Sequence, residues 1–456
     1  MLSTINPTTG ETLPPMTALD RSEAFVRVDQ SATAFAQWRH TDFNTRATLL
    51  REVAALMRAE VEQLAPLMTQ EMGKPIKEAR AEVEKAAWCA EHYAEFAAEY
   101  LATETLASDA TVSFVQYLPL GPILGILPWN APFWLAFRFC APALMAGNTC
   151  LLKHDPHVPA CAAAIASVFE RAGAPAGVFL NLPLTNADVA SVIQHPKVQG
   201  VSFTGSEKAG GLVAGLAAGA IKPVVLELGG ADPCIVMADA DLDAAIPIIT
   251  LSRMINAGQS CIAAKRIIVE ASIYDEVVSR LTESMAQLKM GDPRLETTDI
   301  GPIARADLRD QLHRQVTETR AAGARCLLGG EMPSGPGFFY PPTLLVDVTT
   351  DMVAAQEETF GPVMVVMRAN DADEAIRIAN DTPYGLAGSV WSSTDRAIEM
   401  AQQLETGQVA INGIVKTDPR LPSGGIKRSG IGRELGPHGI REFANAQQIW
   451  VGPKQD

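Results

Sequence analysis

The chain has no cysteine or histidine pattern that is typical of a metal site or a disulfide framework. Its seven cysteines are odd in number, spread along 456 residues and without a C-x-x-C pair, so neither a zinc site nor a set of structural disulfides is predicted. The seven histidines form no H-x-x-x-H or H-E-x-x-H sequence, the spacing that places two imidazoles on one helix face. We therefore assign no residue to a metal.

Long apolar runs and clusters of basic residues are also missing. No stretch approaches the roughly 18 consecutive apolar residues of a membrane-spanning helix, and the N-terminus has a polar start rather than a signal region. The formal net charge is -15, with Lys and Arg scattered, so no patch is predicted for a phosphate backbone or an anionic membrane surface. We expect a cytoplasmic protein without nucleic-acid or membrane partners.

The pattern that is present is that of a large α/β protein. A length of 456 residues predicts two or three domains. Apolar residues recur at helical spacing over residues 21–38, 45–68 and 77–102. From residue 121, apolar strand-like runs alternate with helices, which predicts a parallel sheet covered on both faces and a nucleotide-binding type of architecture. The strands are expected at 123–127, 149–152, 178–182, 198–203 and 223–228, and the helices at 132–145, 158–172, 186–194 and 206–218.

A second α/β set follows and predicts a second domain. Its helices are expected at 242–256, 273–289 and 305–322, and its strands at 266–269, 343–348, 363–367, 386–391 and 409–412. Residues 111–117 alternate with a period of two, and residues 443–451 are also β-like. These two segments are candidates for pairing with a neighbouring subunit.

Three residues carry candidate chemistry. Cys261 lies late in a predicted helix, just before a strand, where its sulfur can face a cleft as a nucleophile; the alternative is a cysteine that only packs. Glu227 is a carboxylate in an apolar strand, which suits either a general base with a raised pKa or a buried ion pair. Asn130 follows a buried strand, so its amide can stabilise an oxyanion or simply serve a turn.

Cofactor candidates lie at strand ends, although the G-x-G-x-x-G fingerprint is missing from the first strand. Gly205 and Ser206 open a helix, whose free N–H groups suit a pyrophosphate; an ordinary serine N-cap is the alternative. Lys153 closes a strand and can reach ribose hydroxyls, unless it is an exposed loop lysine. A dinucleotide site at this edge of the sheet is the resulting hypothesis.

Taken in order, the motifs resemble those of the aldehyde dehydrogenase superfamily over essentially the whole chain. They are Pro-Trp-Asn ending at Asn130, Lys153, Phe-Thr-Gly-Ser ending at Ser206, Leu-Glu-Leu-Gly-Gly around Glu227, Gly-Gln-Ser-Cys ending at Cys261, Glu358-Thr359-Phe360-Gly361-Pro362 and Gly424-Gly425-Ile426-Lys427-Arg428-Ser429-Gly430. The resemblance implies an α/β fold with a Rossmann-like cofactor domain (1–110 and 121–228), a catalytic domain (229–435) and a small β oligomerisation element (111–120 and 436–456). It also implies at least a dimer, as a homodimer or homotetramer.

The resemblance further implies the role of each site residue. Cys261 would attack an aldehyde, its own N–H and the Asn130 amide would hold the oxyanion, and Glu227 would activate water to hydrolyse the resulting thioester. Lys153 and Glu358 would hold cofactor riboses. Phe360 would contact the nicotinamide, and Gly205, Ser206 and Trp129 would lie near the pyrophosphate, although a tryptophan at a strand end also commonly packs.

Cofactor and substrate preferences depend on two further positions. Many NAD-using relatives have a glutamate three residues after the strand lysine, and Pro156 replaces it here, so NADP is admissible beside NAD, with Lys153 or His154 facing its 2′-phosphate. Asp155 argues for NAD if its side chain turns inward.

Arg138 lies in the aromatic helix with Trp134, where both would contact the substrate and a guanidinium would suit a carboxylate; an ion pair is the alternative. This arginine resembles that of compact bacterial succinate semialdehyde dehydrogenases, but Ile255 stands where some of those enzymes have a second arginine. We therefore predict an NAD(P)-dependent succinate semialdehyde dehydrogenase. The alternatives are a broad-specificity aliphatic or aromatic aldehyde dehydrogenase, a CoA-acylating enzyme, or a non-catalytic binding protein of the same fold.

Overall fold

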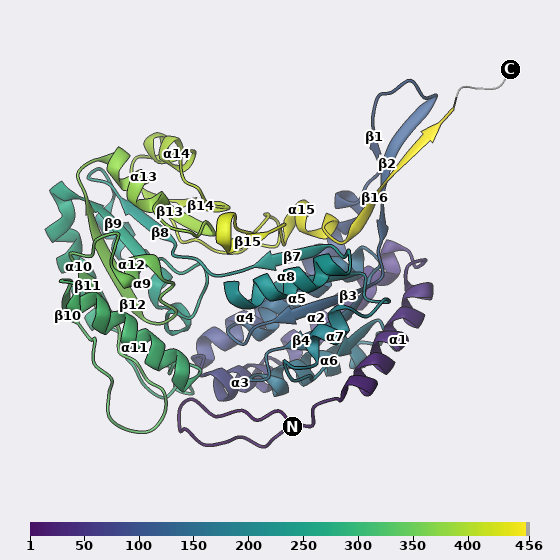
Figure 1. Cartoon of the computed structure of the whole chain (residues 1–456), viewed down its shortest axis with the longest axis horizontal. Coiled ribbons are helices and arrows are strands. Elements are labelled where there is room, and N and C mark those ends of the chain that lie inside the picture. The colour runs from purple at the N-terminus through teal and green to yellow at the C-terminus, as the bar shows by residue number, and fades with distance from the viewer. Residues whose placement is uncertain (453–456) are drawn as a thin grey trace.

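Residues 1–452, which the computed structural model describes, form three β-sheets, and helices cover two of them (Figure 1). The first sheet has the strand order β15-β7-β6-β3-β4-β5. All its neighbouring pairs are parallel except β15 with β7. Its strands are β3 (Pro122–Leu127), β4 (Thr149–His154), β5 (Phe179–Asn181), β6 (Gly200–Thr204), β7 (Val224–Glu227) and β15 (Gly430–Ile431).

Helices of the N-terminal half pack around this first sheet. They are α1 (Arg21–Trp38), α2 (Phe43–Ala59), α3 (Val61–Met72), α4 (Ile76–Tyr100), α5 (Pro132–Met145), α6 (Pro159–Arg171), α7 (Val189–Ile193) and α8 (Glu207–Gly219). The helix expected over residues 45–68 is two helices, because the chain leaves helical geometry at Glu60 (φ -114°) before α3 begins. Periodicity does not reveal this break, since both helices bury apolar residues against α4 and α6.

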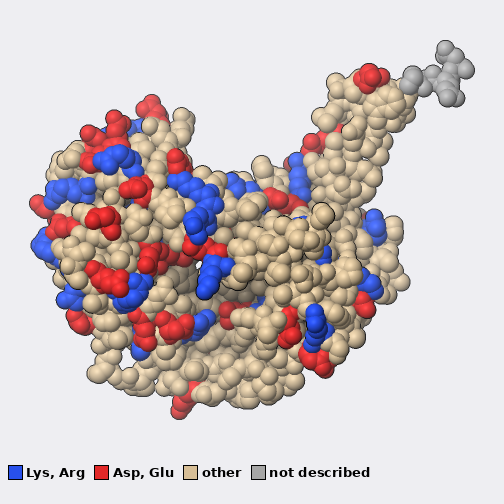
Figure 2. Space-filling view, viewed as in Figure 1, with Lys and Arg blue, Asp and Glu red and all other residues tan. Residues whose placement is uncertain are grey.

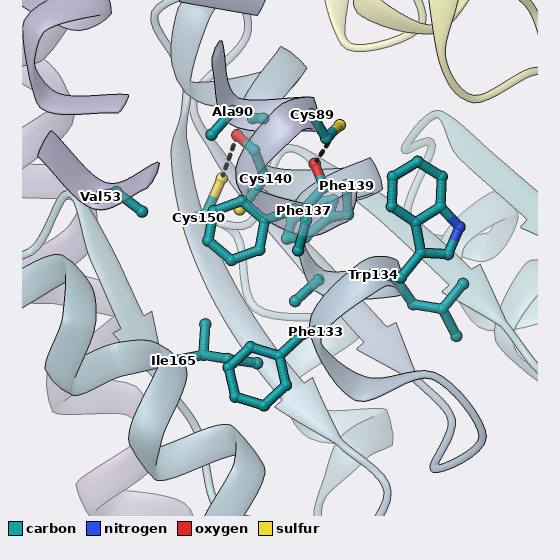
Figure 3. Close-up of a cluster of buried hydrophobic side chains, with 14 of the residues drawn as sticks. Val53, Cys89, Ala90, Phe133, Trp134, Phe137, Phe139, Cys140, Cys150 and Ile165 are labelled. Atoms are coloured by element: carbon teal, nitrogen blue, oxygen red, sulfur yellow. Dashed lines mark hydrogen bonds between the residues drawn. The ribbon is translucent and has the colours of Figure 1, made fainter. Parts of the chain in front are cut away.

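The helix α5 forms the centre of the N-terminal core. All of its residues are buried, including Arg138. A helix that is apolar on all sides is stable only when it is surrounded, and α2, α4, β3 and β4 supply that environment. Figure 3 shows Phe133 and Trp134 pointing to different sides of α5, and the Cys89 thiol donating to the Phe137 carbonyl (3.6 Å).

The second sheet has the order β10-β11-β12-β9-β8-β13-β14, and only β10 runs antiparallel to its neighbour. Its strands are β8 (Pro233–Val236), β9 (Arg266–Glu270), β10 (Arg325–Leu328), β11 (Thr343–Val346), β12 (Val363–Ala369), β13 (Ala387–Trp391) and β14 (Gln408–Ile411). Its helices are α9 (Leu242–Met254), α10 (Tyr274–Ala286), α11 (Ala306–Ala321), α12 (Val353–Gln356), α13 (Ala372–Asn380) and α14 (Thr394–Ala401), with 3-10 turns η1 (Ile255–Gly258) and η2 (Ala271–Ile273).

The third sheet is an arm that projects from the rest of the molecule (Figure 1). It consists of β1 (Glu104–Thr105), β2 (Val112–Pro119) and β16 (Ala444–Val451), and β2 and β16 pair antiparallel along their whole length. The turn η3 (Lys427–Ser429) and helix α15 (Gly436–Arg441) precede β16. The predicted oligomerisation element runs to residue 456, and residues 453–456 lie outside the described residues.

Charge is distributed unevenly over the surface. In the view of Figure 2, acidic and basic side chains intermingle over the lobe that contains the second sheet, and few lie on the arm. Within residues 1–452, no helix combines the length and apolar character needed to cross a membrane.

Candidate active site

Cys261 lies outside the helix in which it was expected. The helix α9 ends at Met254, and three successive residues, Asn256 (φ 56°), Ala257 (φ 53°) and Gly258 (φ 72°), then adopt left-handed backbone angles. Non-glycine residues rarely take this conformation, and it persists only where the surroundings enforce it. The strained turn directs the chain back toward the first sheet and leaves the side chain of Cys261 partly exposed.

Buried groups hold this turn in place. The fully buried Arg253 donates to the carbonyl oxygens of Gly258 (3.2 Å), Val363 (2.6 Å) and Thr359 (2.6 Å). A Cβ at Gly258 would collide with the Gly361 carbonyl. Only glycine fits this contact. The turn η1, which precedes the candidate nucleophile Cys261 and is called the nucleophile turn below, therefore packs backbone against backbone with the segment after Glu358.

Asn130 reaches the same turn from the first sheet. Its Nδ2 donates to the Gln259 carbonyl (3.1 Å), and Asn256 Nδ2 donates to the carbonyls of Asn130 (2.9 Å) and Gln259 (3.1 Å). The Glu78 carboxylate on α4 accepts from the Asn256 N–H (2.7 Å). An asparagine amide has two N–H donors, so Asn130 keeps one for a ligand beside Cys261.

The Cys261 thiol lies among charges of both signs. Burial raises its pKa to about 11; the positive charges of Arg138 and Lys265 oppose this shift, and the negative charges of Glu227 and Glu358 support it. The sulfur is therefore a thiol at neutral pH. A base must remove its proton before it can act as a nucleophile.

Glu227 is the buried carboxylate at the end of β7. Its Oε2 accepts from Arg138 (3.2 Å), while its Oε1 is buried without a hydrogen-bond partner. Burial raises the pKa of Glu227 to about 7, although the Arg138 guanidinium favours the charged form. The sequence left open a buried ion pair or a general base, and the structure is compatible with both. One oxygen of Glu227 is in an ion pair, and the other is free to accept a proton near neutral pH.

The geometry around Arg138 favours the ion-pair interpretation that the sequence left open. The guanidinium is 3% exposed and contacts Glu227 and also Glu434, which accepts from its Nε at 2.7 Å. Burial lowers the pKa of Arg138, but Glu434 and Glu227 raise it and the net direction is upward. Two carboxylates already balance its charge, so an anionic substrate would have to displace one of them.

At the carboxyl edge of the first sheet, Lys153 points into a polar site. Its Nζ donates to Asn186 Oδ1 (2.7 Å), and burial lowers its pKa to about 8. His154 lies in a different environment from Lys153. Both its ring nitrogens are buried without hydrogen-bond partners, and burial lowers its pKa to about 4. Asp155 accepts from the backbone N–H of His157 (2.9 Å) within its own turn.

The remaining cofactor candidates lie at the start of α8 and around Glu358. Ser206 caps α8 by accepting from the Ala209 N–H (3.4 Å), and Gly205 precedes it directly. Glu358 accepts from the Gly230 N–H (3.2 Å), and its other neighbour is the buried Lys265 ammonium (3.5 Å). Trp129 packs edge-on against Phe360 (centroids 5.8 Å apart). A buried cation, a helix N-terminus and a carboxylate thus follow the edge between the two sheets and fit the ribose and pyrophosphate groups of a dinucleotide.

Sequence reasoning missed four residues that shape this site. They are Glu434, which pairs with Arg138; Lys265, which donates to the Cys261 carbonyl; Arg253; and Glu78. Each acts on a group far away in the sequence or through a backbone atom, so no local motif indicates it. An arginine inside an apolar helix, as Arg253 is in α9, was the one available signal. Among residues 1–452, no cluster of three or more His, Cys, Asp or Glu side chains could hold a metal ion.

Comparisons with known proteins agree with this arrangement. A Synechocystis protein named probable succinate-semialdehyde dehydrogenase [NADP(+)] is 48% identical over 451 residues, which cover 99% of each chain. Succinate-semialdehyde dehydrogenase [NADP(+)] 1 of Mycobacterium tuberculosis is 45% identical, again over 99% of each chain.

Solved structures and family models give the same result. The structure of succinic semialdehyde dehydrogenase from Streptococcus pyogenes in complex with NADP+ superposes with a TM-score of 0.97 and 35% identity, covering 99% of this chain and 100% of that one. The model of the aldehyde dehydrogenase family matches residues 1–449. A family match over residues 1–449, together with relatives that are 45% and 48% identical over 99% of the chain, shows that the chain belongs to the aldehyde dehydrogenase family.

Proposed function

We propose that the protein oxidises succinate semialdehyde to succinate, with NADP as the hydride acceptor. The observation that carries this proposal is that the Glu227 carboxylate lies close enough to the Cys261 thiol to raise its pKa, while Glu227 Oε1 is buried without a hydrogen-bond partner. Membership of the family supports aldehyde oxidation, and the names of the relatives support the substrate and NADP.

The first half of the reaction builds a covalent adduct on Cys261. Glu227 Oε1 accepts the thiol proton, and the thiolate then attacks the aldehyde carbon. The negative charge that develops on the aldehyde oxygen is held by the free N–H of Asn130 and by the Cys261 backbone N–H. The Gln259 carbonyl holds the other Asn130 N–H, so the amide is oriented before the substrate arrives.

The second half releases the acid. A bound dinucleotide supplies the acceptor for the hydride that leaves the thiohemiacetal carbon, and a thioester remains on Cys261. Glu227 transfers its proton to solvent and then takes one from a water molecule, which attacks the thioester carbon. The carboxylate product departs and Cys261 regains its thiol.

The cofactor assignment depends on Lys153 and the loop that follows it. Lys153, Ser206 and Glu358 would hold the dinucleotide, and Phe360 would lie beside its nicotinamide. Pro156 replaces a carboxylate that would repel a 2′-phosphate, and Asp155 is engaged in its own turn. A cation whose hydrogen bond goes to the neutral Asn186 amide, and not to a carboxylate, favours NADP over NAD, with Lys153 rather than the buried His154 facing the phosphate.

A broad-specificity aldehyde dehydrogenase is the second candidate, and the paired state of Arg138 favours it. A survey of kcat/KM over succinate semialdehyde, butanal and benzaldehyde with both cofactors separates the two candidates. We expect succinate semialdehyde with NADP to give the highest value, with Cys261→Ala abolishing turnover of every pair. Equal values for butanal and succinate semialdehyde would reject the substrate assignment, and NAD above NADP would reject the cofactor assignment.

The domain boundaries, the assembly and the location are parts of the same proposal. Residues 1–110 and 121–228 would bind the cofactor and residues 229–435 would carry the catalytic cysteine, with β15 crossing back to the first sheet. The arm of β2 and β16 would join two or four copies, because it projects outward with Val112, Trp450 and Val451 exposed. Seven free cysteines suit the reducing cytoplasm.

A further inference from the structure

One half-buried cation near the active site lacks an anion. Lys85 lies on α4, which packs against α5, and its Nζ is 4.1 Å from the centroid of the Trp134 ring. Its hydrogen-bond acceptor is the Thr417 hydroxyl (3.0 Å). Within residues 1–452, no carboxylate comes within ion-pair distance of this ammonium. A buried charge is normally paired, so this position is prepared for an anion that the chain itself does not supply.

The neighbouring carboxylates are all engaged elsewhere. Glu82 is paired with Lys74 and accepts from the backbone N–H groups of Phe133 and Trp134. Asp418 accepts from Arg420 at 2.6 and 2.8 Å. Glu434 and Glu227 share Arg138.

The charge on Lys85 is correspondingly costly. Burial lowers its pKa to about 8, and the positive charge of Arg138 adds to this effect, while Glu82, Cys89 and Asp418 act in the opposite direction. A carboxylate bound beside Lys85 would offset both the burial of its charge and the repulsion from Arg138. Arg138, by contrast, already has two carboxylates against it.

Trp134 belongs to the helix that follows Asn130. Trp134 and Arg138 are four residues apart and lie on one face of α5, which begins at Pro132, two residues after Asn130. The charge of Arg138 acts on the pKa of both Lys85 and Cys261, so this face of α5 runs from the cation to the reacting centre. Asn130 holds the Gln259 carbonyl two residues before Cys261. A short substrate with its aldehyde at Cys261 would therefore extend along the indole toward the Lys85 ammonium.

We propose that Lys85 is a specificity-determining residue, whose ammonium, with the Thr417 hydroxyl, binds the distal carboxylate of a short semialdehyde while Trp134 contacts its methylene groups. This inference rests on the proposed function, because it names the group that selects the carboxylate. Arg138 contacts Glu227 and Glu434, whereas Lys85 is without an ion-pair partner among the described residues.

Lys85→Met tests the proposal, since methionine keeps most of the length and volume of lysine and removes the charge. With saturating NADP at pH 7, we expect KM for succinate semialdehyde to rise about 30-fold or more with kcat changed by less than about threefold, because a lost charge contact mainly weakens binding. The kcat/KM for butanal should stay within about twofold. Lys85→Arg should retain most of the preference for the semialdehyde.

Lys77→Met is the matched control, because Lys77 lies on the same helix and its ion pair with Asp299 is at the surface. It should leave both substrates unchanged. For the wild type, the ratio of KM for succinate semialdehyde to KM for butanal should rise as the pH increases through about 8, where Lys85 loses its proton. Both substrates require Glu227, so its titration affects the two KM values alike and does not change their ratio.

Two outcomes would overturn the inference. Equal losses for both substrates in Lys85→Met would show that the lysine only supports the fold, and an unchanged KM for succinate semialdehyde would show that another group binds the carboxylate. The proposed function is tested separately by the wild type: it fails if the wild type itself does not prefer succinate semialdehyde over butanal.

Discussion

At the scale of single residues, Glu227 shows how one carboxylate can be both anchored and reactive. Arg138 holds Oε2, which fixes the side chain, and Oε1 remains without a partner. Burial raises the pKa of Glu227 to about 7, so both of its protonation states are accessible near neutral pH. It can therefore accept and return a proton with little cost in either direction.

Glu227→Gln removes this proton acceptor while preserving shape. We expect kcat to fall by about 10²- to 10³-fold, as is typical for loss of a general base. The wild-type kcat should rise with pH through about 7, because the carboxylate must be deprotonated to act, and this step should be missing in the variant. Steady-state rates between pH 5.5 and 9 provide the measurement.

Glu276→Gln is the control for this experiment. Glu276 lies at the surface in an ion pair with Arg280, so its replacement should change neither the rate nor the pH profile. A Glu227→Gln protein that kept the wild-type rate and the step near pH 7 would show that another group is the base.

At the scale of elements, the nucleophile turn depends on close backbone contact between two loops. Gly258 has a left-handed backbone and lies against the Gly361 carbonyl, and Arg253 donates to both loops. The Lys265 ammonium contacts the Cys261 carbonyl and Glu358, so it links the same two segments from a third side. Cys261 is therefore positioned by packing between loops rather than by a regular helix.

Gly258→Ala should disrupt this arrangement. The added methyl group meets the Gly361 carbonyl and the left-handed angle is strained for alanine, at a cost of about 1–3 kcal/mol before any clash is counted. We expect a lower melting temperature and a loss of activity of at least about 100-fold, because small displacements of a reacting group are that costly. Calorimetry and steady-state kinetics measure the two effects.

Gly211→Ala is the matched control, since Gly211 lies within α8 and an added Cβ there meets nothing within 4 Å. Alanine should stabilise the protein by about 0.5–1 kcal/mol because it suits a helix interior better. If both glycine variants behaved alike, the close contact at Gly258 would not be important.

The elements also show what the sequence can and cannot reveal. The range predicted for α5 agrees with the observed helix, because a proline opens it and Arg138 is the one charged residue in its apolar run. Strand β8 (Pro233–Val236) was not predicted, since four residues after two glycines give too short a pattern. The aldehyde dehydrogenase motifs identified the family, but the partners of Arg138 could not be inferred, because Glu434 lies 296 residues away in the chain.

At the scale of the whole molecule, the arm exposes apolar side chains that contacts within the described residues leave partly uncovered. It projects from the body (Figure 1), carries few charged side chains (Figure 2) and exposes about half of Trp450 and Val112. Large exposed apolar side chains beside a sheet edge are typical of contact sites. The proposal that the arm joins copies of the chain follows from these features.

Trp450→Glu should weaken this association. A charge buried in the contact without a partner is unfavourable, so light scattering or sedimentation should detect smaller species, with the fold preserved by circular dichroism. Ile221→Glu, at a position that is 93% exposed on the body, is the control and should leave the assembly unchanged. An unaltered mass for the Trp450 variant would place the interface elsewhere.

The pairing of β2 with β16 also governs when the molecule can finish folding. Gln116 donates to Gln447 across 331 residues, and β15, from residues 430–431, closes the edge of the first sheet against β7. During synthesis, β2 and the outer edge of β7 therefore emerge before their partners β16 and β15, which follow much later in the chain. Such long-range pairing slows folding and prolongs the exposure of open strand edges, so we expect these edges to stay open to misassembly until β15 and β16 have been synthesised.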